Sequence, residues 1–315
     1  MEPSRAVAPQ DPAAGNVAGS LWMLLAVAMA TGMTVTVREA SAALAPAMIA
    51  FLRSGLGLLA LLPFLLRRDA LARLRVRRPK LHLLRAAVIA GALNGGFYAI
   101  VHLPLATATI LFFLAPIFAT ALAPLMAGER VGPRRWAAVG VGFLGALIVL
   151  RPGWQPLELA MLGAVGSSLC YALSLMLAKV AGGEDGPDAV FVSMTVLVAA
   201  FTLPPALLVW RLPPLGSEGL ALWSAVAAVA LFSAVRGYAD IRAYVAGEAA
   251  VVAPVSYLRL PAIGFAGWAL FDERVDFWTW LGGGVIVAST LYIVLREAAL
   301  RRRERRAAAE AGDTI

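Results

Sequence analysis

The sequence has few charged residues, one cysteine and two histidines, and each shortage argues against a class of protein. Charged residues make up 15% of the 315 residues, whereas soluble domains average about a quarter. Cys170 has no partner within the chain, so we expect a small packing residue and no disulfide framework. His82 and His102 do not form a zinc-binding spacing, so no metal site is predicted.

Motifs of nucleotide-driven and hydrolytic sites are also missing. The sequence has neither a glycine loop that ends in Lys-Ser/Thr nor a Gly-x-Ser-x-Gly turn. We therefore expect no cofactor, no direct drive by ATP and no enzyme. A membrane-embedded enzyme acting on lipid is kept as an alternative. Its reactive cluster would be Asp240 with Arg236, or the group of Asp272, Glu273 and Asp276.

What the chain has instead is long apolar stretches. Hydrophobic residues make up 61% of it, and the mean hydropathy is +0.80. A helix that crosses the hydrocarbon core needs about 20 apolar residues. The pattern predicts an all-α membrane protein with ten transmembrane helices, near residues 19–37, 44–66, 83–102, 105–127, 134–150, 157–179, 188–210, 219–244, 249–271 and 277–296. Residues 1–18 are expected to be a disordered cytoplasmic N-terminus, and 297–315 a charged, frayed cytoplasmic tail.

The Lys and Arg residues predict the orientation. Arg38, Arg151, Arg211 and Arg274 lie in or near the odd-numbered loops, and two further arginines lie near span centres. The other basic residues lie in or near the even-numbered loops and the tail. Because cytoplasmic loops carry the excess of Lys and Arg, both termini are predicted to be cytoplasmic. The net charge of +8 is thereby explained by topology, and nucleic acid is not an expected partner.

An internal repeat organises the spans. "GERVGPRRW" at 128–136 corresponds to "DERVDFWTW" at 272–280, so that Glu129 matches Glu273 and Trp136 matches Trp280, each 144 residues on. Each half then holds five spans, and since five is odd the second half enters the membrane from the opposite side. The predicted repeats are 19–151 and 157–296. Inverted repeats are a transporter architecture with the substrate site near the midplane between halves.

These features resemble the drug/metabolite transporter superfamily, in its EamA-type form with ten helices. The resemblance covers about residues 18–297. Its marks are Phe51-Leu52-Arg53, Pro116, "GERVGPRRWAAVGVGFLGALIVLRPG" (128–153) and "VVAPVSYLRLPAIGFAGWALFDERV" (251–275). It implies a carrier of the bacterial inner membrane for amino acids, nucleotide-like metabolites, vitamins or amphipathic compounds.

Two arginines near mid-span are the first candidate site residues. An arginine at the bilayer centre costs about 2.5–3.5 kcal/mol on insertion scales, so it usually faces the bundle interior. Arg53 and Arg259 lie about nine and ten residues into their spans. One interpretation is a cationic site for a substrate carboxylate or phosphate, since the planar guanidinium pairs both oxygens. The other is a structural pair with Asp240 or with backbone carbonyls.

The end of the eighth span adds a polar stripe. Arg236, Asp240 and Tyr244 are spaced by four and share a helix face. Asp240 and Arg236 are candidates for coupling or gating, with Asp240 the carboxylate available for proton coupling. The alternative is an interfacial helix end in water, which we favour for Arg242 and Glu248.

Aromatic and polar side chains near span centres complete the candidate substrate site: Asn94, Tyr98, Tyr171, Ser174, Tyr257 and Trp268. Tyrosine offers a flat face and one hydrogen bond, which suits ring-bearing ligands. Pro254 and Pro261 should break the ninth span, and broken helices line cavities. Tyr257 and Arg259 are therefore the best single prediction for the site.

Together these observations predict a secondary carrier that moves a small organic metabolite by alternating access. The substrate is expected to be an amino acid or a related compound, with an anionic or aromatic group, and export is favoured. The alternative is an importer of a nucleoside-like cofactor or vitamin, such as S-adenosylmethionine or riboflavin. The glycines of the fifth and tenth spans are expected to pack between halves or between two subunits, so the chain is a monomer or a homodimer in the lipid bilayer.

Overall fold

The computed structural model describes residues 12–59, 76–128, 131–153, 157–181, 185, 187–214 and 216–312, and this part of the chain is helical without a β-strand. Its helices are α1 (Pro12–Ala40), α2 (Pro46–Leu59), α4 (Pro79–His102), α5 (Leu105–Phe112), α6 (Ala115–Ala127), α7 (Pro133–Leu150), α8 (Leu159–Ala181), α9 (Pro187–Leu207), α10 (Ser217–Ala246), α11 (Ala249–Ser256), α12 (Arg259–Phe271) and α13 (Phe277–Gly312). Because α5–α6 and α11–α12 each form one interrupted span, the described helices make ten spans. The prediction of an all-α membrane protein is confirmed.

Proline marks where many of these helices begin. Five of them, α1, α2, α4, α7 and α9, have proline as their first residue. The first helical position needs no backbone donor, and the fixed φ of proline already suits the helix. The sequence therefore sets these helix starts locally, and the apolar runs that follow give the spans their length.

Two spans are interrupted at equivalent positions of the repeat. One break lies at Phe113 and Leu114, the other 144 residues on, at Tyr257 and Leu258. Pro116 and Pro261 follow the breaks, and each lacks an N–H and crowds the carbonyl four residues earlier. The break in the ninth span was predicted from its prolines, whereas the break in the fourth was missed.

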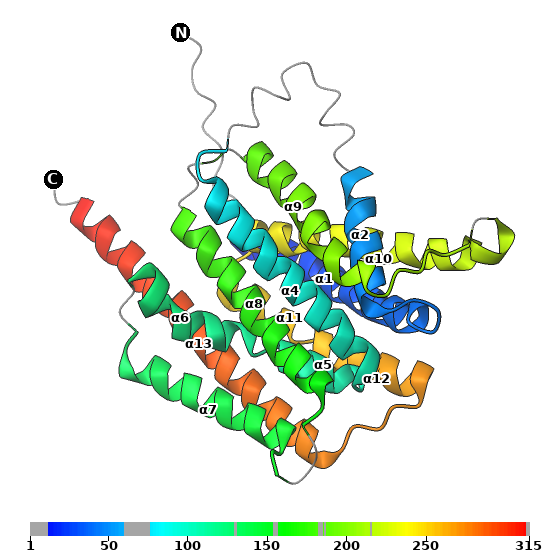
Figure 1. Cartoon of the computed structure of the whole chain (residues 1–315). Coiled ribbons are helices and arrows are strands. Elements are labelled where there is room, and N and C mark those ends of the chain that lie inside the picture. The colour runs from blue at the N-terminus through cyan, green and yellow to red at the C-terminus, as the bar shows by residue number, and fades with distance from the viewer. Residues whose placement is uncertain are drawn as a thin grey trace.

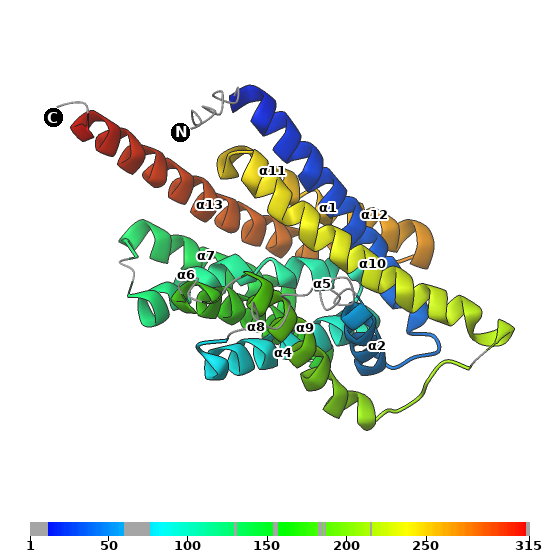
Figure 2. The ribbon, with the colours of Figure 1, turned by 90° about the horizontal axis from the view of Figure 1, so that it is seen from above.

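The two halves are interleaved rather than side by side. Helix α1 packs along α10, α8 packs along α4, and α7 packs along α13, so each pair joins the first half to the second (Figures 1 and 2). Close approach of α4 and α8 depends on Gly95 and Gly163, because a Cβ on Gly95 would lie 2.8 Å from the carbonyl oxygen of Gly163. Cys170 packs at the same interface, where a Cβ on Gly91 would lie 3.4 Å from its sulfur.

The glycines of the fifth and tenth spans pack between the halves, as one of the two alternatives predicted. A Cβ on Gly145 would lie 3.0 Å from the Gly282 carbonyl oxygen of α13, and one on Gly283 would lie 2.7 Å from Ile110. A Cβ added to Gly140 or Gly284 would meet no other atom within 4 Å, so these two glycines do not contribute to the packing between the halves.

Both ends of the chain differ from the sequence-based expectation. Helix α1 begins at Pro12, so residues 12–18 are helical rather than disordered; Gly15 and Gly19 there pack against the end of α10. Helix α13 continues to Gly312, so the tail expected to fray extends the tenth span as one helix. The alanine, arginine and glutamate residues of this stretch have high helix propensity. Predictions for residues 1–11, for most of the basic loop at 67–80, and for Glu129 and Arg130 fall outside the described residues.

The bundle has two ends that the polar contacts distinguish. At the Arg38 end, α1 and α4 finish, α5 begins, and α12 turns into α13. At the His82 end, α4 and α9 begin and α8 finishes. The start of α1 and the far part of α13 lie at the same end of the bundle (Figure 2), as an even number of spans requires.

Candidate functional site

A cluster of charged side chains joins three helices inside the bundle. Arg53 on α2 donates a hydrogen bond from Nε to Ser233 Oγ on α10, at 2.7 Å. Asp240, also on α10, lies 3.5 Å from Arg236 Nε and 3.8 Å from Arg259 Nη2 on α12. The structure therefore brings together the four charged residues predicted for the site, in the arginine cluster formed by Arg53, Arg236, Asp240 and Arg259.

Local structure places each member of the arginine cluster. Arg236 and Asp240 are one turn apart on α10, which puts them on the same face. Arg259 is the first residue of α12, directly after the break, so the broken span presents it at the interior rather than inside a continuous helix. Asp240 pairs with both Arg236 and Arg259, so the ion pair that was considered as a structural role for Arg259 is present. Each of the two guanidinium groups keeps further N–H donors beside this pairing.

Aromatic rings lie beside the cluster. Tyr257, in the break before Arg259, stacks on Phe113 with ring centroids 5.0 Å apart and an interplanar angle of 26°. The phenol groups of Tyr171 on α8 and Tyr244 on α10 are near enough to interact electrostatically with Arg259. Flat faces and hydrogen-bonding groups thus lie beside a cationic centre, a combination that suits a ring-bearing molecule with acceptor oxygens.

The other predicted site residues are not joined to the cluster by the contacts of the described residues. Asn94 donates to the Ala90 carbonyl within α4, at 2.9 Å, and Tyr98 packs its ring 4.1 Å from that of His102. Ser174 is buried within α8. Trp268 follows Arg259 by nine residues, or two and a half turns, so it leaves α12 on the opposite face; there it contacts Phe265.

Two charged residues near the end of α10, for which an interfacial position was predicted, have contacts outside the cluster. The guanidinium of Arg242 lies over the ring of Trp22 on α1, 5.7 Å from its centroid. Glu248 is the N-cap residue of α11. Arg242 is two residues from Asp240, which directs it to another side of the helix.

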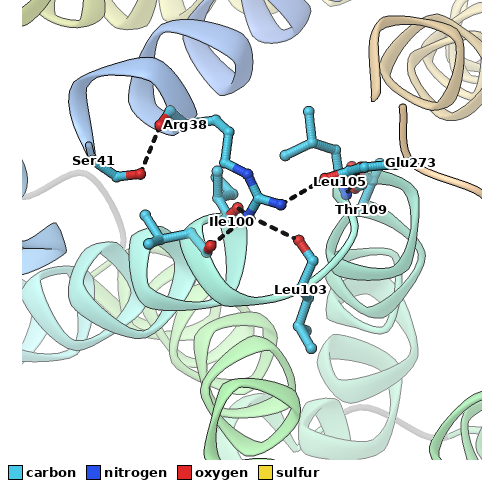
Figure 3. A network of polar contacts seen from close by, with 8 residues as sticks. Arg38, Ser41, Ile100, Leu103, Leu105, Thr109 and Glu273 are labelled. Atoms are coloured by element: carbon cyan, nitrogen blue, oxygen red, sulfur yellow. Dashed lines mark hydrogen bonds and ion pairs between the residues drawn. The ribbon is translucent and has the colours of Figure 1, made fainter. Parts of the chain in front are cut away.

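Sequence reasoning missed the strongest polar network of the described chain, at the Arg38 end (Figure 3). Arg38 Nη2 lies 2.7 Å from Glu273 Oε1, and the other Glu273 oxygen accepts from the Leu105 amide at 2.6 Å. Arg38 also donates to carbonyl oxygens of Ile100, Val101 and Leu103 at the end of α4. The signal in the sequence was the repeated Glu-Arg-Val turn, which was interpreted as structural only.

A second network lies at the His82 end. His82 Nε2 is 2.9 Å from Asp185 Oδ2, and its Nδ1 is 2.6 Å from Ser193 Oγ on α9. The Arg77 amide donates to the other Asp185 oxygen at 2.7 Å. Each end of the bundle is thus held by a polar side-chain contact between residues of the two halves.

Two pockets of the molecule lie outside the arginine cluster. One, of about 410 Å³, is an apolar hollow on α7 and α13 beside Leu147 and Trp278. The other, of about 210 Å³, lies at the Arg38 end between His102, Arg151 and Asp276. Among the described residues no group of His, Cys, Asp or Glu could hold a metal ion.

Ten spans in two interleaved halves, with charged side chains held inside the bundle, define a membrane transporter of small molecules rather than an enzyme. Comparison with known families agrees, because the EamA-like transporter family matches residues 17–151 and again 158–295. The chain belongs to this family, and the two matches correspond to its two repeats.

Individual relatives carry different substrates in their names. A riboflavin transporter of Rhizobium johnstonii is 34% identical over 299 residues, covering 94% of each chain. An S-adenosylmethionine uptake transporter of Rickettsia bellii is 25% identical, covering 88% of this chain and 93% of its own. The pseudopaline exporter CntI of Pseudomonas aeruginosa is 29% identical, covering 87% and 94%.

Proposed function

We propose that the chain is a secondary carrier of the bacterial inner membrane that moves a small organic metabolite with a flat ring and an anionic or acceptor-rich end. It would work by alternating access around the arginine cluster, with both termini in the cytoplasm and the Arg38 end outside. The observation that carries the proposal is the cluster itself, with Arg259 presented beside a tyrosine at a broken span.

The repeat supports a ligand with two unlike ends. Positions 144 residues from Arg53, Arg236, Asp240 and Arg259 are Leu197, Ala92, Gly96 and Ala115. Each charged residue therefore has an uncharged counterpart in the other half. A carrier built this way suits a molecule whose polar end meets the guanidinium groups while its ring lies against aromatic and apolar side chains.

Charge distinguishes the candidate substrates. S-adenosylmethionine carries a sulfonium cation, which three arginines against one carboxylate would repel. Riboflavin has a flat ring with two carbonyl oxygens that a guanidinium can bind, and the relative from Rhizobium johnstonii is named a riboflavin transporter. We therefore place riboflavin-like molecules and aromatic or acidic amino acids before S-adenosylmethionine.

Asp240 and Arg236 are proposed to couple or gate transport. When Asp240 is ionised it holds Arg236 and Arg259 in place, and its protonation would release both. We propose export as the direction of transport. Uptake is tested beside it, because one relative is named an exporter and another an uptake transporter.

The test is transport by the purified protein in liposomes, measured in both directions. Riboflavin, tryptophan, glutamate and S-adenosylmethionine are each supplied labelled, with and without a proton gradient. We expect one of the first three to move, and Arg259→Ala to reduce its rate at least tenfold.

Arg242→Ala is the matched control, since it removes an arginine of α10 that lies over Trp22 and away from Asp240. It should leave the rate within about twofold of the original. The proposal fails if Arg259→Ala protein that is correctly inserted transports at the normal rate, or if only S-adenosylmethionine moves.

A further inference from the structure

The arginine cluster carries more positive than negative charge. Its four side chains are three guanidinium groups and one carboxylate, so together they carry two uncompensated positive charges. Arg236 is near enough to repel both Arg53 and Arg259. Such an arrangement inside a membrane protein is stabilised when another group supplies negative charge.

Asp240 does not satisfy the arginines that it faces. Its two contacts, at 3.5 and 3.8 Å, are longer than the 2.7–2.9 Å of a charge-assisted hydrogen bond. Arg259 Nε is buried and makes no hydrogen bond with the described residues. Each guanidinium has five N–H donors, so three arginines that share one carboxylate at these distances have donors left for another acceptor.

The cluster is also partly exposed, and its electrostatic potential favours an anion. The side chains of Arg259, Arg236 and Asp240 are 21%, 28% and 31% exposed, so the cluster is not sealed off by the side chains around it. Arg259 opens α12, a helix of 13 residues, and the positive end of a helix dipole favours an anion there. The guanidinium charge and the helix end act in the same place.

We infer that a small inorganic anion of the chloride or phosphate class binds in the arginine cluster, between Arg259, Arg236 and Arg53, when no organic substrate is present. The anion supplies the negative charge that Asp240 leaves short. The acidic or acceptor-rich end of the substrate displaces it, a step that rests on the function proposed above. The carrier then exchanges one ligand for another at the cluster instead of exposing bare arginines.

The binding test uses the purified full chain in detergent and follows thermal unfolding with sodium chloride or sodium phosphate. Sodium gluconate at equal ionic strength is the reference, because it screens charge equally but is a larger anion than chloride or phosphate. We expect the unfolding temperature to rise and saturate with chloride or phosphate and to change little with gluconate. The anion that saturates at the lower concentration identifies the class.

Charge changes at the cluster should move the affinity in opposite directions. Asp240→Asn should lower the anion concentration for half-saturation about tenfold, whereas Arg259→Gln should raise it at least tenfold. Arg242→Gln is the control and should leave it unchanged. A residue with a structural role only would not give opposite signs for Asp240 and Arg259. If Arg259→Gln fails to fold, Arg236→Gln takes its place.

Two outcomes would overturn the inference: equal stabilisation by gluconate and the small anions, or an anion effect that Asp240→Asn and the arginine variants leave unchanged. Transport measurements distinguish a failure of the anion site from a failure of the proposed function. When a substrate is transported, raising the anion concentration from about 5 mM to about 200 mM should raise the KM for that substrate and leave kcat unchanged. An anion effect without any transported metabolite would remove the proposed function and keep the anion site.

Discussion

Phe113 and Tyr257 occupy equivalent positions of the two repeats and stack on each other, with ring centroids 5.0 Å apart. Each lies in the break of an interrupted span, and each belongs to a different half. When the two halves of an inverted repeat exchange conformations, a contact between equivalent residues maps onto itself. This stack can therefore persist while contacts at the two ends open in turn.

The stack predicts that two substitutions of Tyr257 have different effects on the KM of transport. Tyr257→Ala removes the ring and should raise KM for a ring-bearing substrate about two- to tenfold, the range that corresponds to the 0.5–1.5 kcal/mol of an aromatic pair. Tyr257→Phe keeps the ring and should leave KM within twofold. Initial rates in liposomes give both values. Equal KM values for the two variants would show that the ring does not contact the substrate.

The pair of Arg38 and Glu273 should hold the Arg38 end together. Glu273→Ala would leave Arg38 without its ion pair and the Leu105 amide without an acceptor. We expect the free energy of unfolding in detergent to fall by about 2–3 kcal/mol, somewhat less than for a fully buried pair that loses one partner, because the Arg38 side chain is 22% exposed. Arg38→Ala, and the double variant, complete the cycle that measures the pair itself.

Arg151 provides the matched control for this pair, at the same end of the bundle. It pairs with Asp276 at 2.9 Å, but the Asp276 side chain is 46% exposed. Exposed pairs contribute about 0–1 kcal/mol, so Arg151→Ala should lower the free energy of unfolding by less than 1 kcal/mol. Equal losses for Glu273→Ala and Arg151→Ala would contradict the role given to the buried pair.

Gly267 should be required for Glu273 to reach its partners. The Glu273 amide donates to the Gly267 carbonyl at 3.1 Å, and a Cβ on Gly267 would lie 2.6 Å from Glu273 Oε2. Gly267→Ala would therefore push the carboxylate away from Arg38 and lower the free energy of unfolding by about 1–3 kcal/mol.

Gly264→Ala, one turn earlier on α12, is the matched control for Gly267→Ala. Its nearest neighbour would be a ring carbon of Trp280 at 3.7 Å, an ordinary contact. Alanine there should be neutral or stabilising by up to about 1 kcal/mol, since it is the better helix former. Chemical unfolding of both variants, alone and with Glu273→Ala, measures the effect. A Gly267→Ala effect that persists in full without Glu273 would show another cause.

The sequence was sufficient for the architecture because the relevant signals are local. Apolar length predicts a span, proline predicts a helix start or break, and a charged motif repeated 144 residues apart predicts the duplication. The break at Phe113 was missed because both prolines of that span, Pro116 and Pro124, follow the break, whereas Pro254 and Pro261 frame the other one. The helical tail was missed because its charge was given more weight than its helix propensity.

The sequence predicted the cluster only in part, because a site depends on which helices meet. The spacing of Arg236 and Asp240 could be read along one helix, but Arg53 and Arg259 reach them from other helices across the bundle. Trp268 has the right chemistry and depth, yet helix rotation turns it away from Arg259. Arg38 and Glu273 are 235 residues apart, and no local pattern connects them.

The contact at the His82 end should make stability depend on acidic pH. The hydrogen bond from the Arg77 amide, and then the contacts with His82, hold the pKa of Asp185 below its ordinary value, although desolvation opposes them. A depressed pKa means that the ionised carboxylate stabilises the folded state. That contribution is complete above the unfolded pKa of about 3.9 and is lost as the pH falls through the lower folded value.

We therefore expect the unfolding temperature in detergent to decrease as the pH falls below about 4, and Asp185→Asn to remove this part of the decrease. The substitution would also lower the unfolding temperature at neutral pH, because a neutral amide is a weaker acceptor than the carboxylate for the hydrogen bond from the Arg77 amide. Asp272→Asn is the control, since Asp272 is exposed and asparagine also tolerates its left-handed φ of 50°. If the pH profiles of the original chain and Asp185→Asn are parallel, Asp185 does not hold the His82 end through its charge.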